Sequence, residues 1–171
     1  MEAVKILFVL CLMLVCCNCW QNNFDGPLSY ECPTGKVLSE ISSEHSNYYE
    51  DRRWNFQCQY TAALTPSSRC TWTNRVNEYD RVLDFKCPSG GAITGLKSVH
   101  NNHYEDRVWD VKCCTVIRMP TRCILSPYVN SFDGNMMYRI HDGKYPQGIY
   151  SVHSDHYEDR RYKFYECNMR L

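Results

Sequence analysis

Three similar stretches decide the fold: HSNYYEDRRWNFQC at residues 45–58, HNNHYEDRVWDVKC at 100–113 and HSDHYEDRRYKFYE at 153–166. Each contains the tetrapeptide Tyr-Glu-Asp-Arg, and successive copies are separated by 55 and then 53 residues. A period of this length is too long for a small solenoid and predicts three lobes of one domain.

The residues upstream of each stretch repeat in the same frame, as NNFDGPLSYEC, NEYDRVLDFKC and NSFDGNMMYRI. The repeats therefore cover about residues 22–58, 77–114 and 130–167, and the connectors cover 59–76 and 115–129. Agreement in both halves makes coincidence a poor explanation.

Alternation of apolar residues in both halves of the repeat predicts β-strands. Leu28 and Tyr30 share one parity, as do Trp54 and Phe56, and turn-forming residues such as those at 33–35 follow the first strand. Strand, turn and strand is the simplest unit. The sequence predicts an all-β single compact domain of three pseudo-equivalent lobes, an approximate threefold internal repeat joined by disulfides.

The amino terminus predicts secretion. Residues 1–19 have a charged start and an apolar stretch of about a dozen residues, which is typical of a signal peptide cleaved near Cys19/Trp20. The domain then covers 20–171. No later apolar stretch reaches the roughly 20 residues of a membrane span, and a formal net charge of zero argues against nucleic acid as a partner.

Four of the twelve cysteines lie within residues 1–19, and the remaining eight predict four disulfides. The third repeat has Ile140 and Glu166 where the other two repeats have cysteines, and this joint loss indicates that the missing positions are bonded to each other. The favoured pairs are Cys32 with Cys58, Cys87 with Cys113, Cys70 with Cys114, and Cys123 with Cys167. Exchanging the partners of the adjacent Cys113 and Cys114 gives a second pattern that the sequence leaves open.

The hexapeptides DRRWNF at 51–56, DRVWDV at 106–111 and DRRYKF at 159–164, together with NNFDGPLSYECP, resemble the dermatopontin family. The resemblance covers essentially the whole secreted chain. It implies a non-enzymatic extracellular matrix protein associated with proteoglycans, collagen assembly and cell adhesion, and invertebrate relatives include haemagglutinins, shell-matrix proteins and a cytotoxin. Tyr162 in the third copy, and Val108 and Val111 in the second, depart from the family motif.

Two hypotheses apply to the repeated motif. In the structural hypothesis, which we favour, each aspartate orients its neighbouring arginine or caps a turn, and the arginine stacks on the aromatic face. In the binding hypothesis, the arginine fork takes a sulfate or carboxylate and the rings stack on sugars. The candidate ligand-binding residues are Asp51, Arg52, Trp54, Asp106, Arg107, Trp109, Asp159, Arg160 and Tyr162.

Two further sets of residues repeat. His45, His100 and His153 would form a zinc site if they met on an axis, but local hydrogen bonding is the favoured role, and neither a metal nor a cofactor is expected. Tyrosines flanked by acidic residues are candidate sulfotyrosines: Tyr30, Tyr49, Tyr79, Tyr104 and Tyr157.

Catalytic motifs such as GxSxG or HExxH do not occur, so we expect no enzyme activity. The leading hypothesis is a secreted extracellular matrix or adhesion protein that binds matrix proteins, proteoglycans or sulfated glycans and cell-surface receptors. The alternative is a carbohydrate-binding lectin or haemagglutinin of innate defence.

Overall fold

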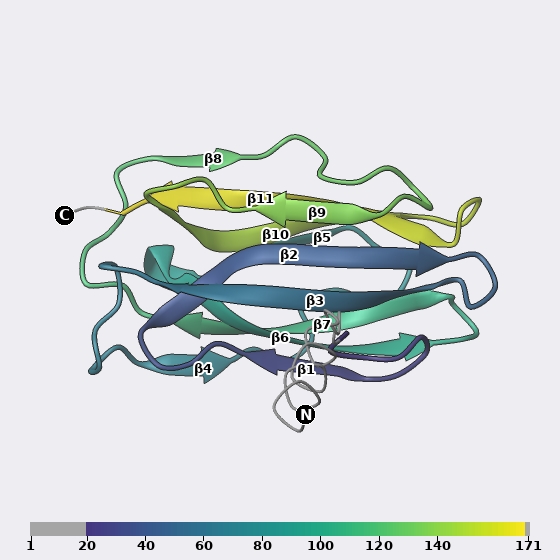
Figure 1. Cartoon of the computed structure of the whole chain (residues 1–171), viewed down its shortest axis with the longest axis horizontal. Helices are drawn as coiled ribbons and strands as arrows, with labels where there is room; N and C mark the ends of the chain where they lie inside the picture. Colours follow the sequence, from purple (N-terminus) through teal and green to yellow (C-terminus); the bar gives the residue numbers. More distant parts are fainter. Residues whose placement is uncertain (1–19, 170–171) are drawn as a thin grey trace, which may run out of the picture.

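The computed structural model describes residues 20–169, so the predicted signal peptide lies outside the described residues. The described chain is built from eleven strands and one 3-10 turn at Pro88–Gly90 (Figure 1). The strands are β1 (Leu28–Glu31), β2 (Lys36–Ser46), β3 (Asp51–Tyr60), β4 (Cys70–Trp72), β5 (Leu83–Lys86), β6 (Ala92–Asn101), β7 (Asp106–Cys114), β8 (Cys123–Leu125), β9 (Met136–Arg139), β10 (Lys144–Ser154) and β11 (Asp159–Asn168). The all-β prediction is confirmed, and residues 20–169 hold no helix long and apolar enough to cross a membrane.

Three long antiparallel hairpins, β2–β3, β6–β7 and β10–β11, form the frame of the molecule. In Figure 1 the strands run roughly side by side and the three hairpin turns gather at the right-hand end. The prediction of two strands per repeat was incomplete, because each repeat has a short strand followed by two long ones. The missed strands are β2, β6 and β10, whose inward positions include serine and histidine, so their apolar alternation is weak.

Each short strand pairs with the hairpin of another repeat. β1 adds to β6, β5 adds to β10, and β9 returns to β2, which closes the arrangement. The sheets are consequently β1-β6-β7-β4 (sheet A), β9-β2-β3 (sheet B) and β5-β10-β11-β8 (sheet C). Exchange of strands between repeats means that no repeat can complete its own sheet.

The core lies where the inner faces of the three hairpins meet. Trp54, Trp109 and Tyr162 contact one another edge to face, with ring centroids 5.1, 5.2 and 6.3 Å apart. All three rings are buried, and Ile41 and Leu96 pack in the same cluster. Edge-to-face packing suits aromatic quadrupoles and adds to the free energy gained by burying the rings.

Four disulfides hold the opposite end from the hairpin turns, and they are the pairs favoured from the repeat: Cys32–Cys58, Cys87–Cys113, Cys70–Cys114 and Cys123–Cys167. The neighbours Cys113 and Cys114 face opposite sides of β7, so they bond to different segments. Two of the disulfides, Cys70–Cys114 and Cys123–Cys167, join each connector to the hairpin that follows it, and the other two join positions within one repeat.

Candidate functional site

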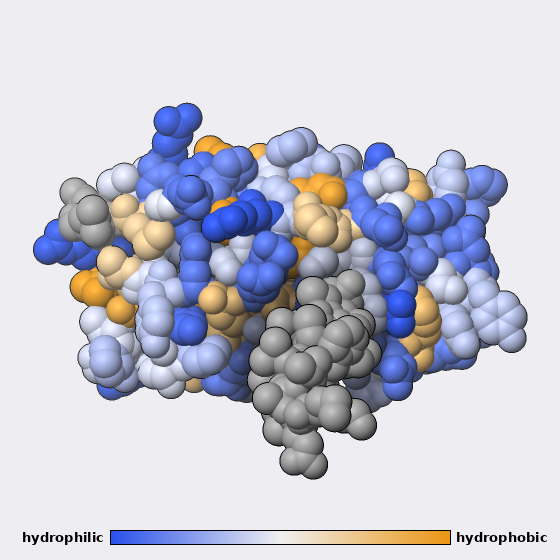
Figure 2. All heavy atoms as spheres, in the orientation of Figure 1, coloured by the Kyte–Doolittle hydropathy of each residue, from blue (hydrophilic) through white to orange (hydrophobic). Residues whose placement is uncertain are grey.

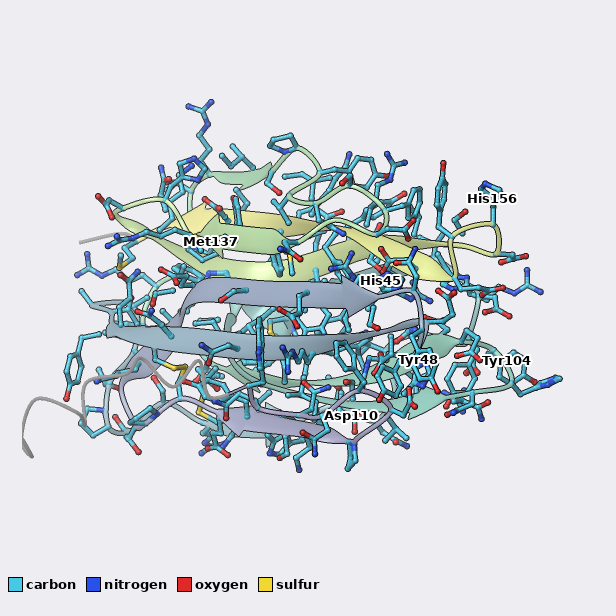
Figure 3. All side chains as sticks on the ribbon, turned by 45° about the vertical axis from the view of Figure 1, so that its right-hand side comes forward. His45, Tyr48, Tyr104, Asp110, Met137 and His156 are labelled. Atoms are coloured by element: carbon cyan, nitrogen blue, oxygen red, sulfur yellow. A yellow bond between two sulfur atoms is a disulfide. The ribbon has the colours of Figure 1, made fainter. Side chains whose placement is uncertain are left out.

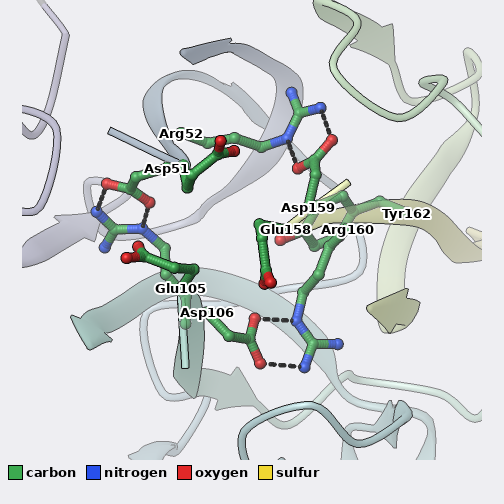
Figure 4. Close-up of a pocket in the computed structure, with 10 residues that line it drawn as sticks. Asp51, Arg52, Glu105, Asp106, Glu158, Asp159, Arg160 and Tyr162 are labelled. Carbon is green, nitrogen blue, oxygen red and sulfur yellow. Dashed lines mark hydrogen bonds and ion pairs between the residues drawn. The ribbon is translucent and has the colours of Figure 1, made fainter. Parts of the chain in front are cut away.

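The repeated Asp-Arg motif forms a closed ring of ion pairs between repeats. Arg107 binds Asp51 through two hydrogen bonds of 2.6 Å, and Arg160 binds Asp106 at 2.6 and 2.7 Å. Arg52 completes the ring by binding Asp159 at 2.6 Å on both nitrogens. Figure 4 shows the three bidentate pairs around a common centre. The idea that each aspartate orients its neighbouring arginine was wrong, because each one binds the arginine of another repeat.

Further hydrogen bonds satisfy the remaining polar groups of this ion-pair ring. The guanidinium of Arg107 donates to the hydroxyl of Ser98 on the facing strand at 3.0 Å and to the carbonyl of Gly26 at 2.9 Å. The carboxylate of Asp51 also accepts a hydrogen bond from the backbone N–H of Asp25 at 2.8 Å. Asp25 holds a left-handed φ of 58°, which aims this N–H at the carboxylate. A buried charge pair is stable only when its remaining hydrogen-bonding groups are satisfied in this way.

Three glutamates surround the ring on the side of the hairpin turns. Glu50, Glu105 and Glu158 each end a hairpin turn with a left-handed φ, of 45°, 44° and 43°. Together with the ion-pair ring and Tyr162 they line one small pocket, and Figure 4 shows Glu105 and Glu158 beside the ion pairs. We call these three glutamates the carboxylate mouth. Because the ring pairs its charges internally, the carboxylate mouth leaves the pocket acidic.

Burial affects the titration of this pocket. Desolvation raises the pKa of the Glu105 and Glu158 carboxyls, the neighbouring His100 and His153 lower it, and nearby carboxylates raise it, with a net upward shift. Desolvation likewise raises the pKa of the Tyr162 hydroxyl, which lies in the core. The pocket therefore favours a cation or a proton over a further anion.

Each of the three repeated histidines lies between carboxylates of two repeats rather than against the other histidines. Their side chains are at most 1% exposed. Nε2 of His100 lies 3.6 Å from Oε2 of Glu105, while its Nδ1 lies 3.4 Å from Oδ1 of Asp25. His45 and His153 have the same surroundings, so the histidines link repeats through charged neighbours.

The structure places all nine candidate ligand-binding residues in the interior. None is more than 4% exposed, and they are engaged with one another as the ion-pair ring and the aromatic core. Their rings have no exposed face to offer a sugar, and their guanidinium groups are already bound to carboxylates. A surface for a glycan must be sought elsewhere on the molecule: Asp51, Arg52, Trp54, Asp106, Arg107, Trp109, Asp159, Arg160 and Tyr162 are structural here.

Three of the candidate sulfotyrosines lie in the hairpin turns. Tyr49, Tyr104 and Tyr157 are 41–43% exposed and stack on aromatic rings of the preceding segment. Tyr79 is one of those partner rings, while Tyr30 is half-buried and its hydroxyl lies 3.2 Å from the sulfur of Cys58. Figure 3 shows Tyr48, Tyr104 and His156 at the hairpin end of the molecule. Sulfation of these residues remains a prediction.

The outer face of sheet C carries a basic and aromatic surface that the sequence reasoning missed. Lys86 lies over the ring of Tyr165 at 4.0 Å, and both Arg161 and Lys163 lie over the ring of Tyr128, at 4.2 and 4.3 Å. We call this the sheet C face, and we define it by Lys86, Tyr128, Tyr150, Arg161, Lys163 and Tyr165. The outward parity of β11 could have indicated it, because Arg161, Lys163 and Tyr165 alternate with buried residues.

Fold and site together define a disulfide-bonded, all-β protein in which three interlocked repeats use their charged motif to hold the interior together. A family model described as Dermatopontin matches residues 22–171. The chain belongs to the dermatopontin family of extracellular-matrix-associated proteins.

Similar curated proteins include the hemagglutinin/amebocyte aggregation factor of Limulus polyphemus, 40% identical over 99% of both chains. Millepora cytotoxin-1 of Millepora dichotoma is 33% identical over 85% of this chain and 65% of its own length. Dermatopontin of Biomphalaria glabrata is 35% identical over 82% of this chain and 94% of its own. No solved structure matches.

Proposed function

We propose that the protein is a secreted, non-enzymatic matrix and adhesion protein that binds sulfated glycans of proteoglycans through the sheet C face. The observation that carries this proposal is the set of three cations on that face, Lys86, Arg161 and Lys163, which lie over tyrosine rings. Among residues 20–169, no carboxylate forms an ion pair with any of them. An arginine fork and two lysines suit sulfate, and tyrosine rings suit the faces of sugars.

The three sheets differ at the matching outward positions, and the differences support this choice. Arg161 and Lys163 on β11 correspond to Val108 and Asp110 on β7, so sheet A loses two cations there. Arg53 on β3 corresponds to Arg161 but is neutralised by Glu44. The local charge of sheet C thus stands out on a chain of zero net charge.

Gly148 gives the sheet C face its shape. It lies between Lys86 and Tyr165, and a Cβ at this position would meet the carbonyl oxygen of Phe85 at 2.3 Å and the side chains of both neighbours at 3.0 Å. The absence of a side chain allows the ammonium group and the ring to meet above the strand. The face is therefore preorganised by the backbone of β10.

The test is retention on immobilised heparin over a salt gradient. A Lys86→Ala/Arg161→Ala/Lys163→Ala variant should elute at clearly lower salt, because the attraction between charged surfaces is screened by salt. The matched control removes three cations from the other two sheets, as Arg53→Ala/Lys97→Ala/Lys112→Ala, and should elute close to the unchanged chain. Equal losses in both variants would contradict a localised site.

The alternative function is that of a lectin in innate defence, and the similar Limulus protein, named a hemagglutinin and aggregation factor, favours it. The chain also has three exposed aromatic pairs at the hairpin turns, Phe24–Tyr49, Tyr79–Tyr104 and Phe132–Tyr157, which would serve as three sugar platforms. Binding to neutral glycans on an array, together with red-cell agglutination that survives the sheet C variant, would favour this function over the matrix role.

A further inference from the structure

Unpartnered polar atoms concentrate around the three histidines. Within residues 20–169, nine buried side-chain atoms have no hydrogen-bond partner, and six of them belong to this environment. They are Nε2 of His45 and His153, both ring nitrogens of His100, Oδ1 of Asp25 and Oε2 of Glu105. Since buried polar groups are normally paired, these atoms indicate a missing partner in each histidine environment.

The neighbours of two of the rings, His45 and His153, indicate their tautomer. Nδ1 of His45 contacts Oδ1 of Asn47 at 3.3 Å, and Nδ1 of His153 contacts Oδ1 of Asp155 at 3.3 Å. Because both partners offer oxygen acceptors, Nδ1 is the nitrogen that carries the hydrogen, by assignment from the contacts. Nε2 is left as a lone pair that faces the oxygen of a glutamate.

In the first and third repeats this assignment places the Nε2 lone pair against a glutamate oxygen, and Nε2 of His100 has the same position in the second repeat. The distances from Nε2 to the glutamate Oε2 are 3.8 Å for His45 and Glu50, 3.6 Å for His100 and Glu105, and 3.8 Å for His153 and Glu158. Such pairs repel unless a positive species lies between them. In a tetrahedral zinc site with bonds of about 2.0–2.2 Å, two ligand atoms lie roughly 3.3–3.5 Å apart, which is close to the spacing seen here.

The surroundings resemble the outer shell of a metal-binding histidine. Such histidines hold their second nitrogen against a carboxylate, which orients the ring. The Nδ1 atoms lie 3.4–3.6 Å from Asp25, Asp80 and Asp133, each contributed by a different repeat from the histidine. Oδ1 of Asp51 lies 4.0 Å from Nε2 of His100, but it already accepts a hydrogen bond from Arg107 and is not needed as a ligand.

We propose that the histidine and the glutamate of each hairpin turn, His45 with Glu50, His100 with Glu105 and His153 with Glu158, bind a divalent transition-metal ion of the zinc type at the carboxylate mouth. Imidazole nitrogen combined with carboxylate oxygen suits such ions better than Ca²⁺. Two protein ligands per ion leave the other coordination positions to water from the small pocket, so we expect moderate affinity. The proposal is independent of the sheet C face, and neither depends on the other.

The experiment is calorimetric titration of the untagged, disulfide-bonded secreted chain with ZnCl₂ at about pH 7.5, where most histidines are neutral. We expect up to three ions per chain. Glu105→Gln should remove one of them, and Glu50→Gln/Glu105→Gln/Glu158→Gln should weaken binding at least about 10-fold. Glutamine keeps the shape of the side chain, so near-UV circular dichroism should remain unchanged.

The matched control carries the same change in charge at the disulfide end, as Glu31→Gln/Glu40→Gln/Asp142→Asn, and should bind zinc as the unchanged chain does. Nitrogen-15 spectra provide a second readout, because zinc should shift Nε2 of the three buried histidines. Zinc binding that survives the triple glutamine variant would overturn the proposal by placing the ions on exposed histidines. Buried rings that stay doubly protonated and do not respond to about 1 mM Zn²⁺ would also overturn it, because a proton would then fill the gap.

Discussion

The first two repeats and the third repeat fill the same position with different chemistry. In the first two, a disulfide links the end of the short strand to the last long strand, as Cys32–Cys58 and Cys87–Cys113. In the third, Ile140 and Glu166 occupy these positions, and Glu166 is fully buried.

The buried carboxylate has partners that replace the covalent bond. The hydroxyl of Tyr138 donates to Glu166, Nδ1 of His141 lies 2.7 Å from its second oxygen, and Nζ of Lys144 lies 3.9 Å away. Burial, together with the hydrogen bond to Glu166, raises the pKa of the Tyr138 hydroxyl, so the tyrosine stays a donor. The same two strand positions can thus be linked by different chemistry. The first two repeats use a disulfide, which constrains the unfolded chain, whereas the third repeat uses polar contacts that exist only in the folded chain.

Removing the carboxylate should have the largest effect. Glu166→Ala removes a fully buried side chain, leaves the Tyr138 hydroxyl without its acceptor and opens a cavity, so we expect a loss of about 3–5 kcal/mol in the free energy of unfolding. Denaturant unfolding under oxidising conditions measures it. Glu166→Gln keeps the volume and should lose less, and equal losses in both variants would show that the charge rather than the volume matters at this position.

Removing the matching disulfide should cost slightly less. Cys32→Ala/Cys58→Ala opens a loop whose ends are 26 residues apart, and loop-closure entropy predicts a loss of about 3.5 kcal/mol. Thermal unfolding of the variant beside the unchanged chain would measure the loss, and Cys87→Ala/Cys113→Ala serves as the equivalent in the second repeat. A loss below about 1 kcal/mol in both would mean that strand pairing alone holds the junction.

Giving the third repeat the chemistry of the others should exchange its polar contacts for a covalent bond. Ile140→Cys/Glu166→Cys places cysteines where the equivalent Cα atoms of the first two repeats lie 5.8 and 5.5 Å apart. We expect a fifth disulfide that offsets most of the stability lost with Glu166, and reduction of the bond should lower the free energy of unfolding by about 1–3 kcal/mol. Mass spectrometry of the unreduced protein would detect the bond, and free thiols at both positions would show that the third junction has a different geometry.

The smallest effect concerns Tyr145, which replaces the Val37 and Ala92 of the other repeats. Its hydroxyl donates to the carbonyl of Gly90 at 2.8 Å, and burial raises its pKa to about 12. Because the unfolded tyrosine ionises near pH 10 while the folded one stays neutral, its contribution is present below about pH 10 and is lost as the pH rises towards 12.

Tyr145→Phe should cost about 1 kcal/mol at neutral pH by removing the hydrogen bond. It should also flatten the loss of stability above about pH 10 relative to the unchanged chain. Unfolding curves between neutral and alkaline pH test both expectations. Tyr48→Phe, at an exposed turn position, is the control, and an identical alkaline decline in all three proteins would assign the effect to other tyrosines.

Much of the fold was predictable because it depends on local periodicity and on counting. Apolar alternation predicted the short strands and the last long strand of each repeat. The third repeat has Ile140 and Glu166 where the other two have cysteines, and this joint absence of cysteines indicated which of them bond. The long strand β2 was missed because Ser43 and His45 replace apolar residues on its inward face, where Ser43 hydrogen-bonds to Arg52.

The site was less predictable. Neighbours in sequence such as Asp51 and Arg52 suggested a local pair, yet their side chains bind Arg107 and Asp159 of other repeats. The sheet C face was missed because Lys86 and Lys163 lie far apart in the chain and meet the same surface only through strand pairing. The side of the molecule shown in Figure 2 is mostly hydrophilic, with scattered hydrophobic residues.

The sequence by itself determined that the chain is built from three related β units, that eight cysteines form four bridges, and that the Asp-Arg motif recurs in each unit. Only the tertiary structure decided which repeat supplies the arginine that each aspartate binds. Short strands cross to the neighbouring hairpin, and a planar guanidinium binds whichever carboxylate the crossing brings within reach. The spacing of motifs along a chain shows that they repeat, but which charged groups form ion pairs depends on their distances in the folded protein.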